Sequence, residues 1–104
     1  MIRHIAIAAL FAALATPAAF AADLTVTIQN MKFTPKLAEV SVGDTITFIN
    51  KDSAPHTATA DDGAFDTGRL NKDESATVTI AAAGQFNYKC LIHPSMKGVV
   101  SAAE

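Results

Sequence analysis

The chain has 104 residues, a formal net charge of −2 at pH 7 and a single cysteine. A chain of this length can form one small domain with a modest core. The slight acidic excess argues against a nucleic-acid surface, because phosphate binding requires clustered basic residues. One cysteine excludes an internal disulfide and leaves an intermolecular pair, a reactive thiol or a metal ligand as its possible roles.

The first 22 residues are typical of a secretory signal peptide. Arg3 and His4 give a short positive start, an unbroken apolar run covers 5–14, and Ala19-Phe20-Ala21 has the A-x-A form of a cleavage site. We therefore predict cleavage near 21/22 and export to the periplasm. The apolar run is shorter than the roughly 20 residues that span a bilayer, so an uncleaved anchor is the less favoured alternative.

After the signal, apolar and polar residues alternate in the way that predicts β-strands. Residues 23–104 are predicted to form one domain of about seven to eight short strands. These strands are expected over 24–28, 37–42, 45–50, 56–60, 75–80, 85–90 and 97–102. Residues 29–35 are interpreted as a loop or bulged strand, and Gly43-Asp44 as a tight hairpin turn. The expected fold class is all-β, a Greek-key β-sandwich without helices after the signal.

The stretch 61–74 has no periodicity and is predicted to be a surface loop. Its five acidic residues are Asp61, Asp62, Asp66, Asp73 and Glu74. Asp66-Thr67-Gly68 matches the aspartic-protease tripeptide, but that chemistry needs two carboxylates that share a proton, so we interpret it as a turn. A minor hypothesis is that this acidic cluster attracts a basic partner over long range.

Metal-binding side chains are concentrated near the C-terminus, where Cys90, His93 and Met96 follow one another at intervals of three residues. A loop this short can point thiolate, imidazole and thioether at one centre, and Pro94 restricts the backbone beside the histidine. A type 1 copper site takes one thiolate, two imidazoles and a weak axial thioether. The second imidazole has one plausible source in the mature chain, His56. The hypothesis is therefore one type 1 copper ion held by these two histidines, the cysteine and the methionine.

The same residues allow other interpretations. Cys90 alone on a strand could be a small buried hydrophobe. Zinc also binds cysteine and histidine, but thioether is not one of its usual donors, so Met96 favours copper. Cys90 with His93 or His56 could form a nucleophilic dyad, yet no orienting third group or substrate cleft is evident. We therefore expect no catalytic residue, and the chain is predicted not to be an enzyme.

The run Tyr88-x-Cys90-x-x-His93-Pro94-x-Met96, with the upstream Pro55-His56, resembles the cupredoxin family of plastocyanin and azurin relatives. The Cys-x2-His-x2-Met spacing is similar to that of amicyanins, whose ligand loop is equally short. Weaker matches to the family occur at 31–35, 42–44, 65–68 and 98–100. Together these matches cover most of residues 24–102.

The resemblance implies a role for each donor. His56 and His93 would be the imidazole ligands, Cys90 the thiolate and Met96 the axial ligand. It also implies that His93 lies near the surface, where redox protein partners dock. Many family members carry Asn after the upstream histidine, where it braces the cysteine loop. Here the residue is Thr57, whose N–H can still donate to the sulfur but whose side chain is expected to bond fewer partners.

These observations predict an exported small blue copper protein that carries single electrons between redox partners by Cu(II)/Cu(I) cycling. The alternative is a periplasmic copper-binding or delivery protein that uses the same ligands, and a metal-free adhesion-type sandwich is a more distant one. The partners are expected to be redox proteins and not nucleic acid. We expect a monomer without stable membrane association after signal cleavage.

Overall fold

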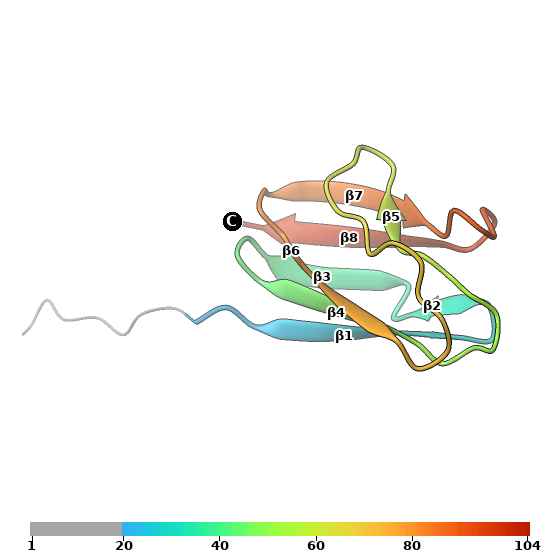
Figure 1. Cartoon of the computed structure of the whole chain (residues 1–104). Helices are drawn as coiled ribbons and strands as arrows, with labels where there is room; N and C mark the ends of the chain where they lie inside the picture. Colours follow the sequence, from blue (N-terminus) through green and yellow to red (C-terminus); the bar gives the residue numbers. More distant parts are fainter. Residues whose placement is uncertain (1–19) are drawn as a thin grey trace, which may run out of the picture.

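The computed structural model describes residues 20–104, so most of the predicted signal peptide lies outside the described residues (Figure 1). The described residues form eight strands and no helix, arranged as two four-stranded sheets. The two sheets face each other across one hydrophobic core, which confirms the predicted all-β sandwich. Within this part of the chain, no helix is long and apolar enough to cross a bilayer.

The first sheet has the strand order β2-β1-β4-β6. Its strands, in chain order, are β1 (Asp23–Gln29), β2 (Lys32–Thr34), β4 (Thr45–Asn50) and β6 (Ser75–Thr79). The two central strands, β1 and β4, run parallel, and each has an antiparallel neighbour at the edge. Alternate residues of β4 are buried, as the apolar–polar alternation of its sequence predicts.

The second sheet has the strand order β3-β8-β7-β5. Its strands are β3 (Leu37–Ser41), β5 (Thr59–Ala60), β7 (Gly84–Lys89) and β8 (Lys97–Ala103). Strands β7 and β8 form an antiparallel pair in which Lys89 lies opposite Lys97. The seven residues between these two lysines hold the predicted cysteine, histidine and methionine donors, so this pair closes the ligand loop at one end of the sandwich.

The predicted hairpin at Gly43-Asp44 is wrong, because the strands on its two sides belong to different sheets. The turn instead carries the chain from β3 in one sheet to β4 in the other. The Asp44 carboxylate accepts the N–H of Ser41 and of Ala22, each at 2.9 Å, and Gly43 has a φ of 94° that favours glycine. Alternation predicts the two strands and the turn, but it does not say which sheet each strand joins.

Residues 29–35 form a hairpin where a loop or bulged strand was expected. Asn30 and Met31 have φ values of 56° and 59°, which make a two-residue turn between β1 and β2. The Asp52 carboxylate accepts both of their N–H groups, at 2.8 and 3.0 Å. The turn is therefore held by a residue that is distant in sequence, and its own residue types carry only a weak turn signal.

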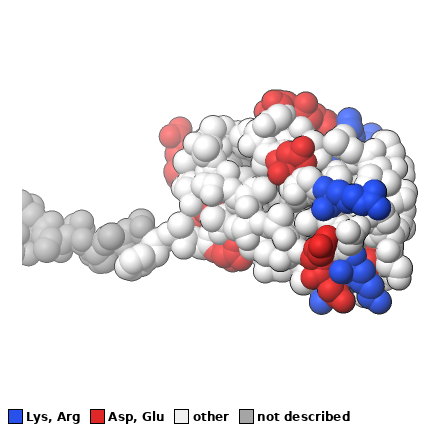
Figure 2. Space-filling view, viewed as in Figure 1, with Lys and Arg blue, Asp and Glu red and all other residues white. Residues whose placement is uncertain are grey.

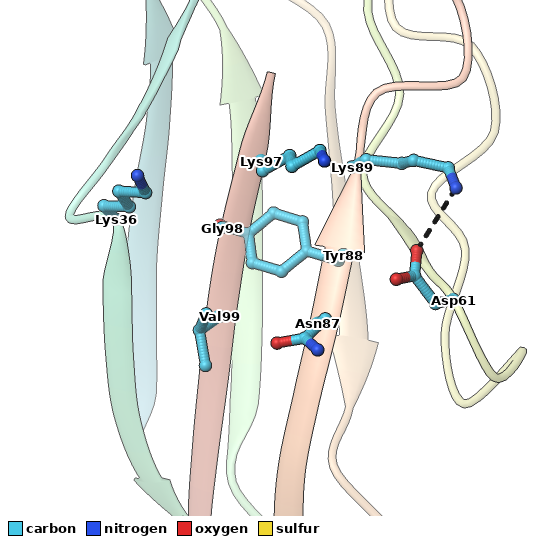
Figure 3. Close-up of a pocket in the computed structure, with 8 residues that line it drawn as sticks. All are labelled: Lys36, Asp61, Asn87, Tyr88, Lys89, Lys97, Gly98 and Val99. Atoms are coloured by element: carbon cyan, nitrogen blue, oxygen red, sulfur yellow. Dashed lines mark ion pairs between the residues drawn. The ribbon is translucent and has the colours of Figure 1, made fainter. Parts of the chain in front are cut away.

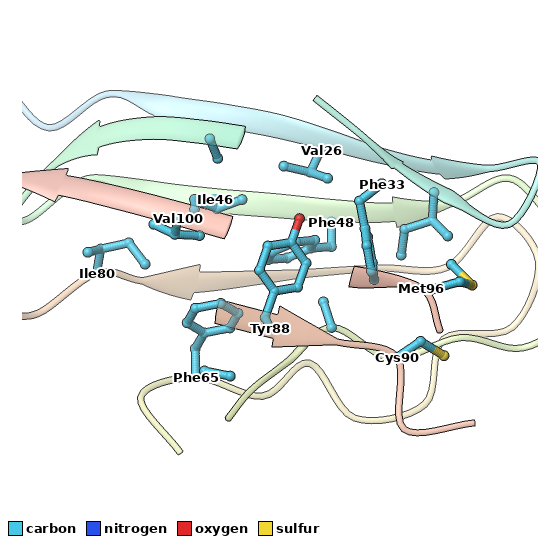
Figure 4. Packing of buried hydrophobic residues seen from close by; sticks show 14 of the residues in the cluster. Val26, Phe33, Ile46, Phe48, Phe65, Ile80, Tyr88, Cys90, Met96 and Val100 are labelled. Atoms are coloured by element: carbon cyan, nitrogen blue, oxygen red, sulfur yellow. The ribbon is translucent and has the colours of Figure 1, made fainter. Parts of the chain in front are cut away.

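The centre of the core is a group of aromatic rings on facing strands (Figure 4). The Tyr88 ring lies with its centroid 4.7 Å from that of Phe33 and 5.5 Å from that of Phe48, both edge-to-face. Gly98 lies opposite Tyr88, and a Cβ at Gly98 would overlap the tyrosine ring, so only glycine fits there. Burial raises the pKa of the Tyr88 phenol. Cys90 and Met96 lie at one end of this aromatic group, so the rigid core leads directly to the donors.

Candidate metal centre

The four predicted donors come from two loops at the same end of the sandwich. His56 follows β4 in an extended segment whose backbone exchanges two hydrogen bonds with Leu70, at 3.0 and 2.7 Å. Cys90 directly follows β7, and Met96 directly precedes β8. The Cys90 N–H donates to the Met96 carbonyl at 3.1 Å, and the Met96 N–H donates to the His93 carbonyl at 2.9 Å. These two bonds fold the ligand loop back on itself.

Three of the predicted donor atoms converge. The Cys90 sulfur lies 3.6 Å from Nδ1 of His56 and 3.8 Å from Nδ1 of His93, and the two nitrogens are 3.2 Å apart. Ligand bonds of about 2.0 to 2.3 Å in a trigonal plane place donor atoms about 3.5 to 3.8 Å apart. The spacing of these three atoms is therefore close to that of ligands around one metal ion.

The surroundings of the Cys90 sulfur suit a thiolate. Cys90 and His56 are both fully buried. The backbone N–H groups of Thr57 and His93 each donate to the sulfur at 3.4 Å. Two N–H donors stabilise negative charge on the sulfur, and a thiolate is the form that binds a metal. The donor from Thr57 is the bond that the sequence predicted.

Met96 is buried at the same end of the core as Cys90, and Figure 4 shows both sulfur atoms on that side. Its place is set by the backbone bonds of the ligand loop, since it accepts from Cys90 and donates to His93. Thioether is a soft donor that suits copper better than zinc. The axial role of Met96 stays a prediction.

Asp52 is a functional residue that the sequence reasoning missed. Its carboxylate lies 2.9 Å from Nε2 of His56, which leaves Nδ1 of the ring to face the sulfur. Burial raises the pKa of this carboxyl, but the N–H groups of Met31 and Asn30, together with His56, outweigh it and hold the pKa below its ordinary value. An acidic residue four positions before a predicted histidine ligand is the signal that could have identified it.

Asn50 is a second residue that the sequence reasoning missed. It is fully buried at the end of β4, and its side-chain amide donates to the carbonyls of Ala54 and Leu70, both at 2.9 Å. Its side-chain oxygen accepts the N–H of Asp52 at 2.9 Å. The side chain therefore fixes the whole turn between β4 and His56. An asparagine in an otherwise apolar buried position of a strand was the available signal.

Thr57 braces the ligand loop through its side chain as well as its backbone. Its hydroxyl accepts the N–H of Leu91 at 2.9 Å and lies 2.9 Å from the hydroxyl of Thr59. The Thr59 hydroxyl in turn donates to the Asp66 carboxylate at 3.0 Å. A chain of three side chains thus connects the ligand loop to the acidic loop, so the Thr57 side chain braces the ligand loop.

His93 is the donor closest to solvent. It is partly exposed, whereas His56 on the other side of the sulfur is fully buried. Two large apolar side chains beside it are exposed, Leu91 at 54% and Ile92 at 40%. The centre therefore reaches the surface on the side of the ligand loop.

Comparison with known proteins shows a family and relatives that the chain resembles. The family model described as a cupredoxin-like domain matches residues 3–102. Amicyanin from Paracoccus denitrificans is 36% identical over 83 residues, which are 74% of this chain and 63% of that protein. The chain thus spans less than two thirds of the length of that relative.

Solved structures show the same fold. A mutant of amicyanin described as Cu(I) has a TM-score of 0.71 at 29% identity, over 77% of this chain and 81% of that one. The copper-containing nitrite reductase of Thermus scotoductus SA-01 has a TM-score of 0.74 at 32% identity, over 88% of this chain but only 26% of that chain. The second match therefore concerns one part of a larger enzyme.

Proposed function

The chain belongs to the cupredoxin-like family, and on that premise we propose that it is an exported small blue copper protein that carries single electrons between redox partners. The observation that supports this most is the convergence of Nδ1 of His56, Nδ1 of His93 and the sulfur of Cys90. Met96 completes the proposed donor set. Thiolate and thioether favour Cu(I), and imidazole accepts either oxidation state.

When bound, copper supplies a one-electron Cu(II)/Cu(I) couple. The chain keeps the donors in place while the charge of the centre changes. Asp52 fixes the ring of His56, and two backbone N–H groups fix the sulfur of Cys90. Donors that are held by hydrogen bonds move little, so the reorganisation that electron transfer requires is small.

Electron transfer without substrate chemistry is the activity that the donor set favours. Catalytic metal sites keep a coordination position open for water or substrate. Here three protein donors converge, the proposed axial donor Met96 is buried at the same end of the core, and His56 and Cys90 are fully buried. The same burial and hydrogen bonding favour retention of the metal over its release, so we place a delivery role second.

The compartment and the partners follow from the same proposal. We propose that 1–22 is a signal peptide, that 23–104 is the mature domain and that the mature protein is a periplasmic monomer. Its partners are redox proteins that dock near His93, because this donor is nearest to solvent and exposed apolar side chains flank it.

The deciding experiment is an optical spectrum after addition of one equivalent of Cu(II). We expect an intense blue thiolate-to-copper band and reversible one-electron voltammetry. The Cys90→Ser variant should lose the band completely, because the thiolate that gives rise to it is absent. A colourless wild-type protein contradicts the proposal, and rapid loss of copper to a competing chelator favours delivery.

A further inference from the structure

The charged residues are distributed unevenly between the two ends of the sandwich. All seven lysine and arginine residues between 20 and 104 lie in the half of the sandwich that contains the metal centre, on or near strand ends: Lys32, Lys36, Lys51, Arg69, Lys72, Lys89 and Lys97. At the opposite end lie Asp23, Asp44 and Glu104, without a basic residue among those described. Figure 2 shows the basic side chains gathered, with some acidic ones among them, at the end away from the N-terminal segment. The metal end is therefore the more positive end.

Four of these lysines line two neighbouring hollows on one side of the ligand loop. One hollow of about 390 Å³ lies between Lys32, Lys36 and Lys97, and Met96 forms part of its wall. The other, of about 330 Å³, shares Lys36 and Lys97 and adds Lys89 (Figure 3). We call these two hollows together the basic groove.

The positive charge of the basic groove is largely uncompensated. Lys89 pairs with Asp61 at 3.5 Å. For the ammonium groups of Lys32, Lys36 and Lys97, the described part of the chain provides no ion pair and no side-chain hydrogen bond. An exposed cation without an internal partner remains available to an external carboxylate.

The carboxylates of the acidic loop are used differently. Asp66 accepts the N–H of Gly68 and the hydroxyl of Thr59, at 2.8 and 3.0 Å. Glu74 accepts the N–H of Asn71 at 2.7 Å, and Asp62 accepts that of Ala64 at 2.9 Å. These bonds hold the loop in shape. The carboxylates of the acidic loop therefore already have hydrogen-bond partners within the chain, whereas three of the groove lysines have none among the described residues.

The basic groove is also next to the metal centre. Met96 lines the larger hollow, and it is linked to Cys90 and His93 through the backbone bonds of the ligand loop. Met31, which is 44% exposed, adds an apolar surface to the same hollow. A protein bound there is close to the centre, and electron transfer is fastest over short distances.

We propose that the basic groove docks a carboxylate-rich surface of the redox partner protein. This proposal rests on the proposed electron-carrier function and adds that the docking surface of the partner is negatively charged. Complementary charges steer two proteins into one orientation and raise the rate of association. Because the chain is acidic overall and its described lysine and arginine residues all lie in the metal half, an acidic partner is repelled by the far end and attracted to the basic groove.

The first test maps anion binding by NMR and does not depend on copper. The probe is hexacyanochromate(III), a paramagnetic anion. It is added to the protein as purified, with the Cys90 thiol kept reduced. We expect selective broadening of amides in 31–37 and 95–99. The triple variant Lys32→Gln, Lys36→Gln, Lys97→Gln should lose this broadening. The control variant Lys51→Gln, Arg69→Gln, Lys72→Gln has the same net charge and should keep it. Broadening centred on the control residues, or unaffected by the first variant, overturns the proposal.

The second test measures how fast ferricyanide oxidises the copper-loaded, reduced protein. We expect the rate to fall about tenfold as ionic strength rises from about 0.01 M to about 0.15 M. The groove variant should react more slowly and with a flatter salt dependence, while the control variant should keep most of that dependence. An equal response of the two variants contradicts docking at the groove.

A carboxylate-rich protein surface is distinguished from a small anion by competition. An oligoglutamate peptide should displace hexacyanochromate from the groove at carboxylate concentrations where free glutamate does not. Equal competition by the two indicates a small-anion site and overturns docking of an acidic protein. If the chain fails to form a blue centre but the anion map is as expected, the electron-carrier function fails while the groove itself is retained.

Discussion

The two loops that meet at the metal centre are held in different ways. The upstream loop, from Asn50 to Thr57, is fixed by buried polar side chains, and its histidine is fully buried. The downstream loop, from Cys90 to Met96, is fixed mainly by its own backbone bonds, and its histidine is partly exposed. Within the described residues, Thr57 of the upstream loop is the only residue outside the downstream loop whose side chain bonds to the backbone of that loop.

This difference indicates a division of roles. A loop with buried, satisfied polar groups is rigid, because every alternative arrangement leaves a polar group unpaired. The upstream loop can therefore hold His56 in a constant position and so set the geometry of the centre. We call this role that of a template. The downstream loop supplies the sulfur donors and the solvent-facing imidazole through which we expect electrons to pass. Substitutions in the upstream loop should then disturb the centre even though only one of its residues is a predicted ligand.

The largest effect is expected for Asn50→Ala. The substitution leaves the carbonyl of Ala54 and the N–H of Asp52 without their partner, and the carbonyl of Leu70 keeps only the N–H of His56. Each unsatisfied buried group costs about 1 to 3 kcal/mol, so we expect a loss of about 3 kcal/mol in the free energy of unfolding. Urea unfolding of the metal-free protein measures this loss. Asn71→Ala, at an exposed position, is the control and should change stability by no more than about 0.5 kcal/mol.

The next largest effect is expected for Asp52→Asn. The amide has nearly the same shape as the carboxylate but lacks its charge, so the ring of His56 is held less firmly. Loss of such a partner of a metal-binding histidine lowers metal affinity by about 10- to 100-fold. Competition with a copper chelator measures the affinity. An affinity equal to that of the wild type would mean that the upstream loop does not act as a template.

The sequence predicted the parts of this site that are local. The spacing of Cys90, His93 and Met96 is a local pattern, and so is the alternation that marks each strand. The contact between Asp52 and the turn at Asn30 joins residues that are 22 positions apart, and it exists only because β1 and β4 lie parallel in one sheet. No local pattern shows which strands pair. The long-range contacts of Asp52 and Asn50 were therefore missed, while the ligand loop was predicted.

The brace between the two loops is tested by Thr57→Val, which keeps the side-chain volume and removes the hydroxyl. The N–H of Leu91 loses its acceptor, and because this bond is only partly buried we expect a loss of about 1 kcal/mol. Hydrogen exchange at the Leu91 amide should then be about five times faster. Thr59→Val is the matched control, since its hydroxyl contacts Thr57 but not the ligand loop. An unchanged Leu91 exchange rate would show that the backbone alone holds the loop.

The smallest effect is expected at the end of the sandwich away from the metal centre. There Asp44 accepts two backbone N–H groups, as Asp52 does, but it does not contact a histidine in the described part of the chain. Asp44 accepts the N–H groups of Ala22 and Ser41, and these bonds hold its pKa below the ordinary value. Its contribution to stability is therefore complete above the unfolded-state pKa of about 4 and is lost as the pH falls through the lower folded-state pKa.

Asp44→Asn removes this charge, so the variant should be slightly less stable than the wild type at pH 7. The difference should shrink below about pH 4 in urea unfolding. Its copper affinity should equal that of the wild type, because the far end does not contact the centre. If Asp44→Asn lowers copper affinity as much as Asp52→Asn does, the effect of Asp52 is a general consequence of lost negative charge. Unequal effects assign it to the bond with His56.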